Sequence, residues 1–178
     1  MGASKRHIGW QVDILSLDFS HYLPLFISGL VETDPPYNFL AYEGCLDMLI
    51  VGGPRHRVLP AVSKIIPALK LCLQSGHRPS VSKALYVFLL VLKCDCPTTG
   101  GLGAMGRAVA PYLPRMLPTL NLYFADERRI GADGAFQMAE DSLSTLVTQV
   151  LETCEMSSGP NAYKVIKYSI PTYETCSM

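Results

Sequence analysis

The amino-acid sequence predicts an all-α protein built from repeated helix pairs. Two observations support this fold class. A segment of sixteen residues recurs later in the chain without gaps, and apolar side chains elsewhere recur at three- and four-residue spacing. No segment shows a convincing alternation of apolar and polar residues, although residues 10–17 could form a short extended stretch. The length of 178 residues suits one domain, so we expect an extended arm over 1–18 and a single helical domain over 19–178.

The repeat is clearest between a segment that starts at Val58 and one that starts at Val109. Their sequences, VLPAVSKIIPALKLCL and VAPYLPRMLPTLNLYF, agree in kind at ten of sixteen positions. A third, shorter copy begins at Tyr22, where Leu23-Pro24 resembles the Leu-Pro pair near the start of the first segment. The two full copies keep these pairs in register: Pro60 with Pro111, Lys64 with Arg115, Pro67 with Pro118, and Leu71 with Leu122.

Each copy is followed by a second amphipathic stretch with helical spacing, and the first of these stretches ends at the helix-terminating pair Gly52-Gly53. Because each pair of helices can bury its apolar faces only against its neighbours, we expect an armadillo- or HEAT-like solenoid. The second helices are predicted at Tyr37–Val51, Ser80–Lys93 and Ala139–Met156, within pairs that span roughly 19–52, 57–94 and 104–156. A short capping helix at Pro160–Tyr168 and an extended tail complete the prediction.

Prolines occur inside the predicted first helices of the second and third pairs, at Pro67, Pro114 and Pro118. Each internal proline costs an isolated helix about 3 kcal/mol, because it removes a hydrogen bond and clashes with the preceding turn. Contacts on both sides of each helix must offset this cost. The prolines therefore favour a stack of helices over a free-standing bundle.

The composition favours a protein whose surface is covered by other proteins. Hydrophobic residues make up 49% of the chain and charged residues only 17%, where about a quarter is usual. The fifteen basic and fifteen acidic side chains cancel, which argues against a nucleic-acid-binding protein. The longest apolar run, Leu85–Leu92, is far shorter than the roughly 20 residues of a membrane span. The first residues carry no apolar signal segment, so the cytosol is the expected compartment.

The segment from Gly101 to Gly106 matches the GxGxxG pattern of dinucleotide-binding sites, and Asp126 follows it at a suitable distance. Its context disagrees with that function, because the apolar run before it has helical spacing and residues 93–100 separate the two, whereas the motif requires a strand, a turn and a helix in succession. A flexible linker between helix pairs is the better interpretation. We expect no cofactor here, although a nucleotide-dependent enzyme remains an alternative that adding NAD or ATP would test.

Cysteine and histidine side chains show no arrangement typical of a metal or catalytic site. Cys94 and Cys96 form a CxC pair rather than the paired CxxC spacing of structural zinc sites. The four histidines are scattered, with no HExxH motif and no GxSxG motif in the chain. We therefore expect no catalytic residue and no metal ligand. The six cysteines are interpreted as reduced, and those within helical patterns as buried.

Two basic clusters in predicted loops are the candidate partner-binding residues. They are Arg55-His56-Arg57 and Arg128-Arg129. Positive charges on loops favour docking on an acidic protein surface. The alternative is that they are solvated loop residues without a partner. The tail after Tyr168 also has two interpretations, and we expect it to pack back on the last helices rather than lie on a partner.

Three groups of residues form a pattern more specific than any single helix. The first is LDFSHYLPLF at 17–26 with Gly29-Leu30, and the second is DPPY at 34–37 followed by Gly44, DML at 47–49 and Gly52-Gly53. The third is the ending, with NAY at 161–163, IKY at 166–168 and IPTYE at 170–174. On these residues the sequence resembles the parkin co-regulated protein family of ciliated and flagellated organisms over nearly the whole chain.

This resemblance implies an armadillo-like fold and a structural, non-enzymatic role in the axoneme. The expected place is the inner junction of the doublet microtubule, where the B-tubule closes on the A-tubule. Partners implied by the resemblance are α/β-tubulin of both tubules, a small β-sandwich protein of the junction, and other microtubule inner proteins. The Cys94–Gly103 and Asp126–Met138 segments differ from the family pattern. A soluble armadillo-type adaptor that binds a non-axonemal partner is the alternative.

Overall fold

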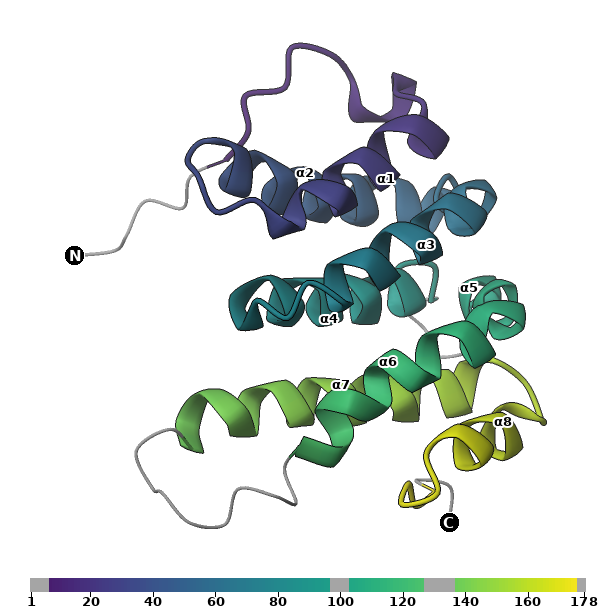
Figure 1. Cartoon of the computed structure of the whole chain (residues 1–178). Helices are drawn as coiled ribbons and strands as arrows, with labels where there is room; N and C mark the ends of the chain where they lie inside the picture. Colours follow the sequence, from purple (N-terminus) through teal and green to yellow (C-terminus); the bar gives the residue numbers. More distant parts are fainter. Residues whose placement is uncertain (1–6, 97–102, 127–136, 176–178) are drawn as a thin grey trace.

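All regular secondary structure in the described part of the chain is helical, as predicted. The computed structural model describes residues 7–96, 103–126 and 137–175 (Figure 1). Short 3-10 helices precede or follow several of the α-helices. The α-helices are α1 (Phe19–Ser28), α2 (Tyr37–Gly52), α3 (Val62–Leu73), α4 (Arg78–Lys93), α5 (Ala104–Val109), α6 (Leu113–Asp126), α7 (Gln137–Ser157) and α8 (Ala162–Ser169).

The helices lie in successive pairs, with α1 and α2 at one end and α8 at the other (Figure 1). Helices α1, α3 and α6 follow one another along one side, and α2, α4 and α7 along the other. The contacts alternate in extent, since α1 packs closely on α3 and α4 on α7, whereas α2–α4 and α3–α6 touch less. The three predicted pairs and the additional short helix are therefore present at the predicted positions.

Proline occupies the same place in all three first helices. Pro24, Pro67 and Pro118 are each the sixth residue of their helix, α1, α3 and α6. The predicted register of the third copy was therefore wrong, because Pro24 lies inside a helix rather than at its beginning. The prediction that Pro114 lies in the interior of a helix was also wrong. It is the second residue of α6, where a missing backbone N–H costs little.

Equivalent side chains link each first helix to the one before it. The Cys72 thiol of α3 donates to the Ile27 carbonyl of α1 over 3.0 Å. The Tyr123 hydroxyl of α6 donates to the Leu73 carbonyl at the end of α3 over 2.5 Å. Cys72 and Tyr123 are aligned in the sixteen-residue repeat. Both satisfy a carbonyl in the last turn of a helix, where intrahelical donors run out.

Helices α1 and α2 approach closely because glycines of α2 face aromatic rings of α1. A Cβ on Gly44 would lie 2.8 Å from the Phe26 ring, and one on Gly52 would lie 2.1 Å from the Phe19 ring. Any side chain at either position would force the two helices apart. These phenylalanines and glycines are among the residues on which the family resemblance rests.

The interpretation of the glycine-rich segment as a linker was wrong for the part that the structure describes. Residues 97–102 lie outside the described residues, but Gly103 is the N-cap residue of the short helix α5, and Gly106 lies within that helix. A Cβ on Gly106 would lie 2.2 Å from the Ser157 hydroxyl of α7. Helix α5 packs against α4 and α7, so these glycines allow close helix contacts.

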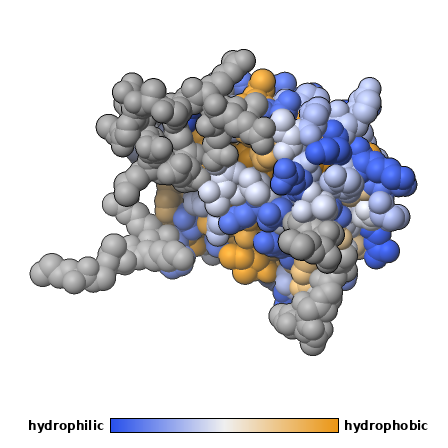
Figure 2. All heavy atoms as spheres, turned by 90° about the horizontal axis from the view of Figure 1, so that it is seen from below, coloured by the Kyte–Doolittle hydropathy of each residue, from blue (hydrophilic) through white to orange (hydrophobic). Residues whose placement is uncertain are grey.

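The C-terminal tail packs back onto the last helices, as predicted. Tyr173 is 2% exposed and its ring lies 6.3 Å from that of Phe124 in α6. The Tyr173 hydroxyl donates to Glu155 Oε2 in α7 over 2.7 Å, and Lys167 donates to the Tyr173 carbonyl. Figure 2 views this end of the molecule, where mainly hydrophilic side chains surround a small apolar group.

The expected N-terminal arm contains a short 3-10 helix, Ile14–Ser16, and lies against α1 and α2. The Trp10 indole donates to Asp47 Oδ2 of α2 over 2.8 Å, and its ring meets that of Phe26 edge-on. Among the described residues, no helix has the length and hydropathy that crossing a membrane requires.

Candidate partner-binding surfaces

The side chains of the first basic cluster, Arg55-His56-Arg57, make contacts within the chain. The Arg55 guanidinium donates to the Val51 carbonyl in the last turn of α2 over 3.0 Å. This bond satisfies a terminal carbonyl and places a positive charge at the negative end of the helix dipole. Arg55 therefore has a structural role, while its exposed guanidinium still has donors available for a partner.

Arg57 joins the N-terminal arm to α1. Its guanidinium donates to the Leu15 and Leu17 carbonyls over 3.3 and 3.4 Å and lies 5.6 Å from the centre of the Phe19 ring. A cavity of about 260 Å³ lies beside it and is lined by Asp18, Phe19, Ser20, His56, Arg57 and Pro60. Its mixed lining and small size suit water or one side chain of a partner.

His56 connects the same loop to α4 and α5. It has a left-handed backbone conformation, with φ of 57°, and its side chain is 63% exposed. Its Nδ1 atom lies 3.9 Å from Oδ2 of Asp95, whose side chain is only 1% exposed. The same carboxylate accepts the Met105 backbone N–H at the start of α5. The loop 55–57 is thus held at the point where α2, α4 and α5 meet. The second predicted cluster, Arg128-Arg129, lies outside the described residues.

Sequence reasoning missed a strong segregation of charge along the chain. Residues 7–54, which include α1 and α2, carry six carboxylates and no Lys or Arg. Residues 55–125, which include α3 to α5 and nearly all of α6, carry nine Lys or Arg and one carboxylate, the buried Asp95. The total charge of zero hid this pattern, which counting by segment would have found. Exposed cations of this basic section are Arg55, Arg57, Lys64, Arg78, Lys93, Arg107 and Arg115.

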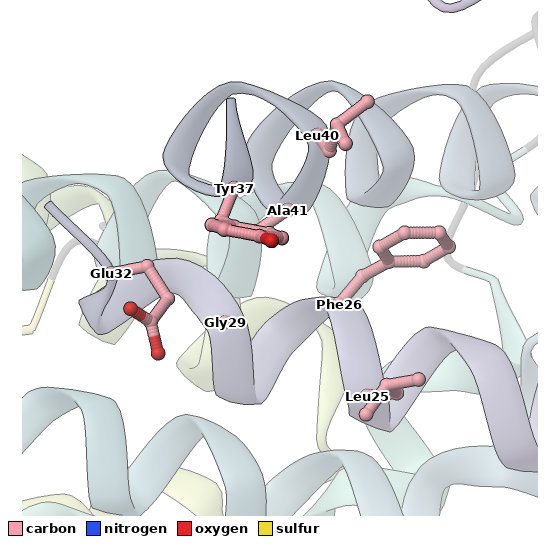
Figure 3. A pocket seen from close by; sticks show the side chains of 7 residues that line it. All are labelled: Leu25, Phe26, Gly29, Glu32, Tyr37, Leu40 and Ala41. Atoms are coloured by element: carbon pink, nitrogen blue, oxygen red, sulfur yellow. The ribbon is translucent and has the colours of Figure 1, made fainter. Parts of the chain in front are cut away.

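An apolar groove between α1 and α2 is a second feature that the sequence did not reveal. Figure 3 shows Glu32 at one end and Leu25 and Phe26 at the other, with Tyr37 and Leu40 contributed by α2. The groove has a volume of about 470 Å³. Leu25 and Tyr37 are 58% and 65% exposed, which is unusual for large apolar side chains that share one hollow.

The cysteines have the environment of structural thiols. Cys45, Cys72 and Cys154 are buried in helices as predicted, and the five cysteines that the structure describes are all free. Burial raises the pKa of Cys154 to about 12 and that of Cys72 to about 11. Burial is also the main cause that raises the pKa of Cys94 to about 12. Within the described ranges, no three His, Cys, Asp or Glu residues come together in a way that could hold a metal ion.

The comparison with known proteins decides the family. The family model described as parkin co-regulated protein matches residues 1–175. This chain belongs to the parkin co-regulated protein family. A curated mouse member, parkin coregulated gene protein homolog, is 36% identical over 172 residues, which cover 95% of this chain and 67% of the mouse protein.

Residues that carried the resemblance to the parkin co-regulated protein family have identifiable structural roles. Phe19 and Phe26 pack on glycines of α2, and Gly53 lies against the end of α4. Tyr173, near the end of the characteristic C-terminal segment, donates a hydrogen bond to Glu155. The family signature of this chain therefore coincides largely with helix contacts. It also includes Leu25, Phe26 and Tyr37 of the apolar groove, but not the exposed cations of the basic section.

Proposed function

We propose that this chain is a structural, non-enzymatic component of the ciliary or flagellar axoneme. Its proposed place is the inner junction of the doublet microtubule, where it links the A-tubule to the B-tubule as a microtubule inner protein. The observation that carries this proposal is membership of the parkin co-regulated protein family across nearly the whole chain. The partners in this proposal are α/β-tubulin, a small β-sandwich protein and other microtubule inner proteins.

The scaffold in this proposal is an armadillo- or HEAT-like helical repeat. The equivalent prolines of α1, α3 and α6 support a repeating unit. The donors Cys72 and Tyr123, which bond the end of the preceding first helix, support the same unit. A stack of this kind offers long side surfaces for partners, because each helix pair buries only the faces toward its neighbours.

The basic section from 55 to 125 is the surface that we assign to tubulin. An acidic partner surface would be attracted by its seven exposed Lys and Arg side chains, and the only carboxylate of this section is buried. Lys64 on α3 and Arg115 on α6 occupy equivalent repeat positions, and both are exposed. Equivalent charges on successive pairs suit a partner that is itself a regular polymer.

Cosedimentation of the purified chain with microtubules tests this function, together with detection of the chain in isolated doublets. We expect the chain in the microtubule pellet and in isolated doublets. Absence from isolated doublets, combined with diffuse localisation in a ciliated cell, would overturn the axonemal assignment and favour the soluble adaptor.

A further inference from the structure

We propose that the groove between α1 and α2 binds a basic amphipathic helix of a partner protein. This site goes beyond the proposed function, because tubulin is assigned to the basic section at 55–125 and not to this end of the molecule. The occupant is identified by two features of the groove, its apolar lining and the sign of the charge around it.

The groove is held open by contacts within the chain. Phe26 forms part of its lining and cannot move inward, because its ring already lies against Gly44 and meets the Trp10 ring at 6.0 Å. Gly29 allows α1 to approach α2 beside the groove, since a Cβ there would lie 2.9 Å from the Ala41 Cβ. A preformed site of this kind loses little conformational entropy on binding.

The exposed apolar side chains of the groove are arranged for a helix. Leu25 comes from α1, whereas Tyr37 and Leu40 lie one turn apart on α2 (Figure 3). A volume of about 470 Å³ can accept a few aliphatic side chains. An amphipathic helix presents such side chains at i, i+3, i+4 and i+7, which is the usual way to fill a groove between two helices.

The charge around the groove selects a basic helix. Residues 7–54 contain no Lys or Arg, so no cation of this section would repel one. The Glu32 carboxylate lies at one end of the groove and is exposed. A Lys or Arg residue flanking the apolar anchors would therefore meet the Glu32 carboxylate, whereas an acidic helix would be repelled.

Fluorescence anisotropy with two synthetic peptides tests the proposal on the full chain. The probe is a labelled helical peptide with Leu at i, i+4 and i+7 and Lys at the remaining exposed positions. The control peptide carries Glu at every Lys position. We expect micromolar binding of the Lys peptide that weakens as salt is raised, and at least tenfold weaker binding of the Glu peptide.

Matched substitutions locate the binding site. We expect Leu25→Ser and Glu32→Lys each to weaken binding of the Lys peptide by about tenfold. Leu122→Ser and Glu174→Lys are the controls, since Leu122 is 66% exposed on α6 and Glu174 is exposed in the tail. The controls should change the affinity less than twofold. All four variants should keep the helical circular dichroism of the parent chain.

Three results would overturn the proposal. The first is equal binding of the Lys and Glu peptides, and the second is equal weakening by Leu25→Ser and Leu122→Ser. The third is absence of peptide binding together with self-association that Leu25→Ser abolishes, which would assign the groove to a second copy of the chain. Microtubule cosedimentation of the Leu25→Ser variant should be unchanged, so that failure of this site is distinguishable from failure of the axonemal assignment.

Discussion

Glu155 is a buried carboxylate in the last turns of α7 that accepts hydrogen bonds from the tail. The hydroxyls of Tyr173 and Thr175 both donate to it. Burying a charge is unfavourable unless donors replace water, so the tail and the carboxylate depend on each other. The sequence predicted that the tail packs back, but Glu155 lies eighteen positions earlier inside a helix, and nothing in its spacing indicated this pairing.

Tyr173→Phe should destabilise the chain by about 1–3 kcal/mol, because a buried carboxylate loses a donor while the ring contacts remain. Urea unfolding followed by circular dichroism measures this change. Tyr163→Phe is the control, since Tyr163 is half-buried against the core in α8 and should cost less than about 0.5 kcal/mol. Equal losses in the two variants would contradict the role assigned to the Tyr173 hydroxyl.

The buried thiols should make the chain less stable in alkali. Burial raises the pKa of Cys154 from its ordinary 9.0 to about 12, so the native state keeps a proton that the unfolded state releases. The stabilising contribution is complete below the unfolded pKa and is lost as pH rises toward the folded one. The urea midpoint should therefore fall above a pH of about 9, and Cys154→Ala should reduce the fall. An unchanged slope in Cys154→Ala would contradict this assignment.

At the scale of elements, the match between the two sixteen-residue segments was predictable from the sequence. The register of the shorter copy near Tyr22 was not. The segments at Val58 and Val109 share two prolines, and they form the same unit of a 3-10 turn followed by a helix. Helix α1 shares only the interior proline and its apolar neighbours, so a short match at Leu23-Pro24 allowed the wrong register. The structure gives the correct register of the repeat in α1, because packing against α3 fixes which face of α1 is buried.

Helix α5 shows why local sequence signals failed around the glycine-rich segment. Glycine disfavours a helix by about 1 kcal/mol relative to alanine, so Gly103 and Gly106 indicated a linker. The tertiary structure reverses this preference, because α5 lies where side chains would collide with Asp95 and Ser157. Only the absence of a Cβ allows the helix to fit there, and this reason is not visible before the helices are assembled.

Gly53→Ala tests the same principle at the junction of α2 and α4. A Cβ at position 53 would lie 2.3 Å from the Cys94 carbonyl oxygen, which belongs to the backbone and cannot rotate away. We expect a loss of about 1–3 kcal/mol in urea unfolding. Gly9→Ala is the control, because no atom lies within 4 Å of its Cβ position. A Gly53→Ala variant as stable as Gly9→Ala would show that α2 and α4 separate easily.

For the whole molecule, a net charge of zero conceals an acidic first pair and a basic middle section. The composition alone excluded a strongly basic protein, but it did not exclude a basic section of the chain. Counting charges along the chain would have predicted that section from the sequence. The apolar groove was not predictable in this way, since Leu25 and Tyr37 belong to different helices and share a hollow only after packing.

Binding of the basic section to microtubules should depend on salt and on equivalent charges of successive helix pairs. The Debye length is about 8 Å at physiological ionic strength, so contacts between exposed charges weaken steeply as salt rises. We expect the double variant Lys64→Gln/Arg115→Gln to cosediment with about tenfold lower affinity, since each exposed charge contributes modestly and the two lie on neighbouring helices. Lys164→Gln, an exposed change in α8 outside the basic section, is the control and should bind as the parent chain does. Affinity that is independent of salt, or lost equally in the control, would mean that apolar contacts or another surface hold the chain on the microtubule.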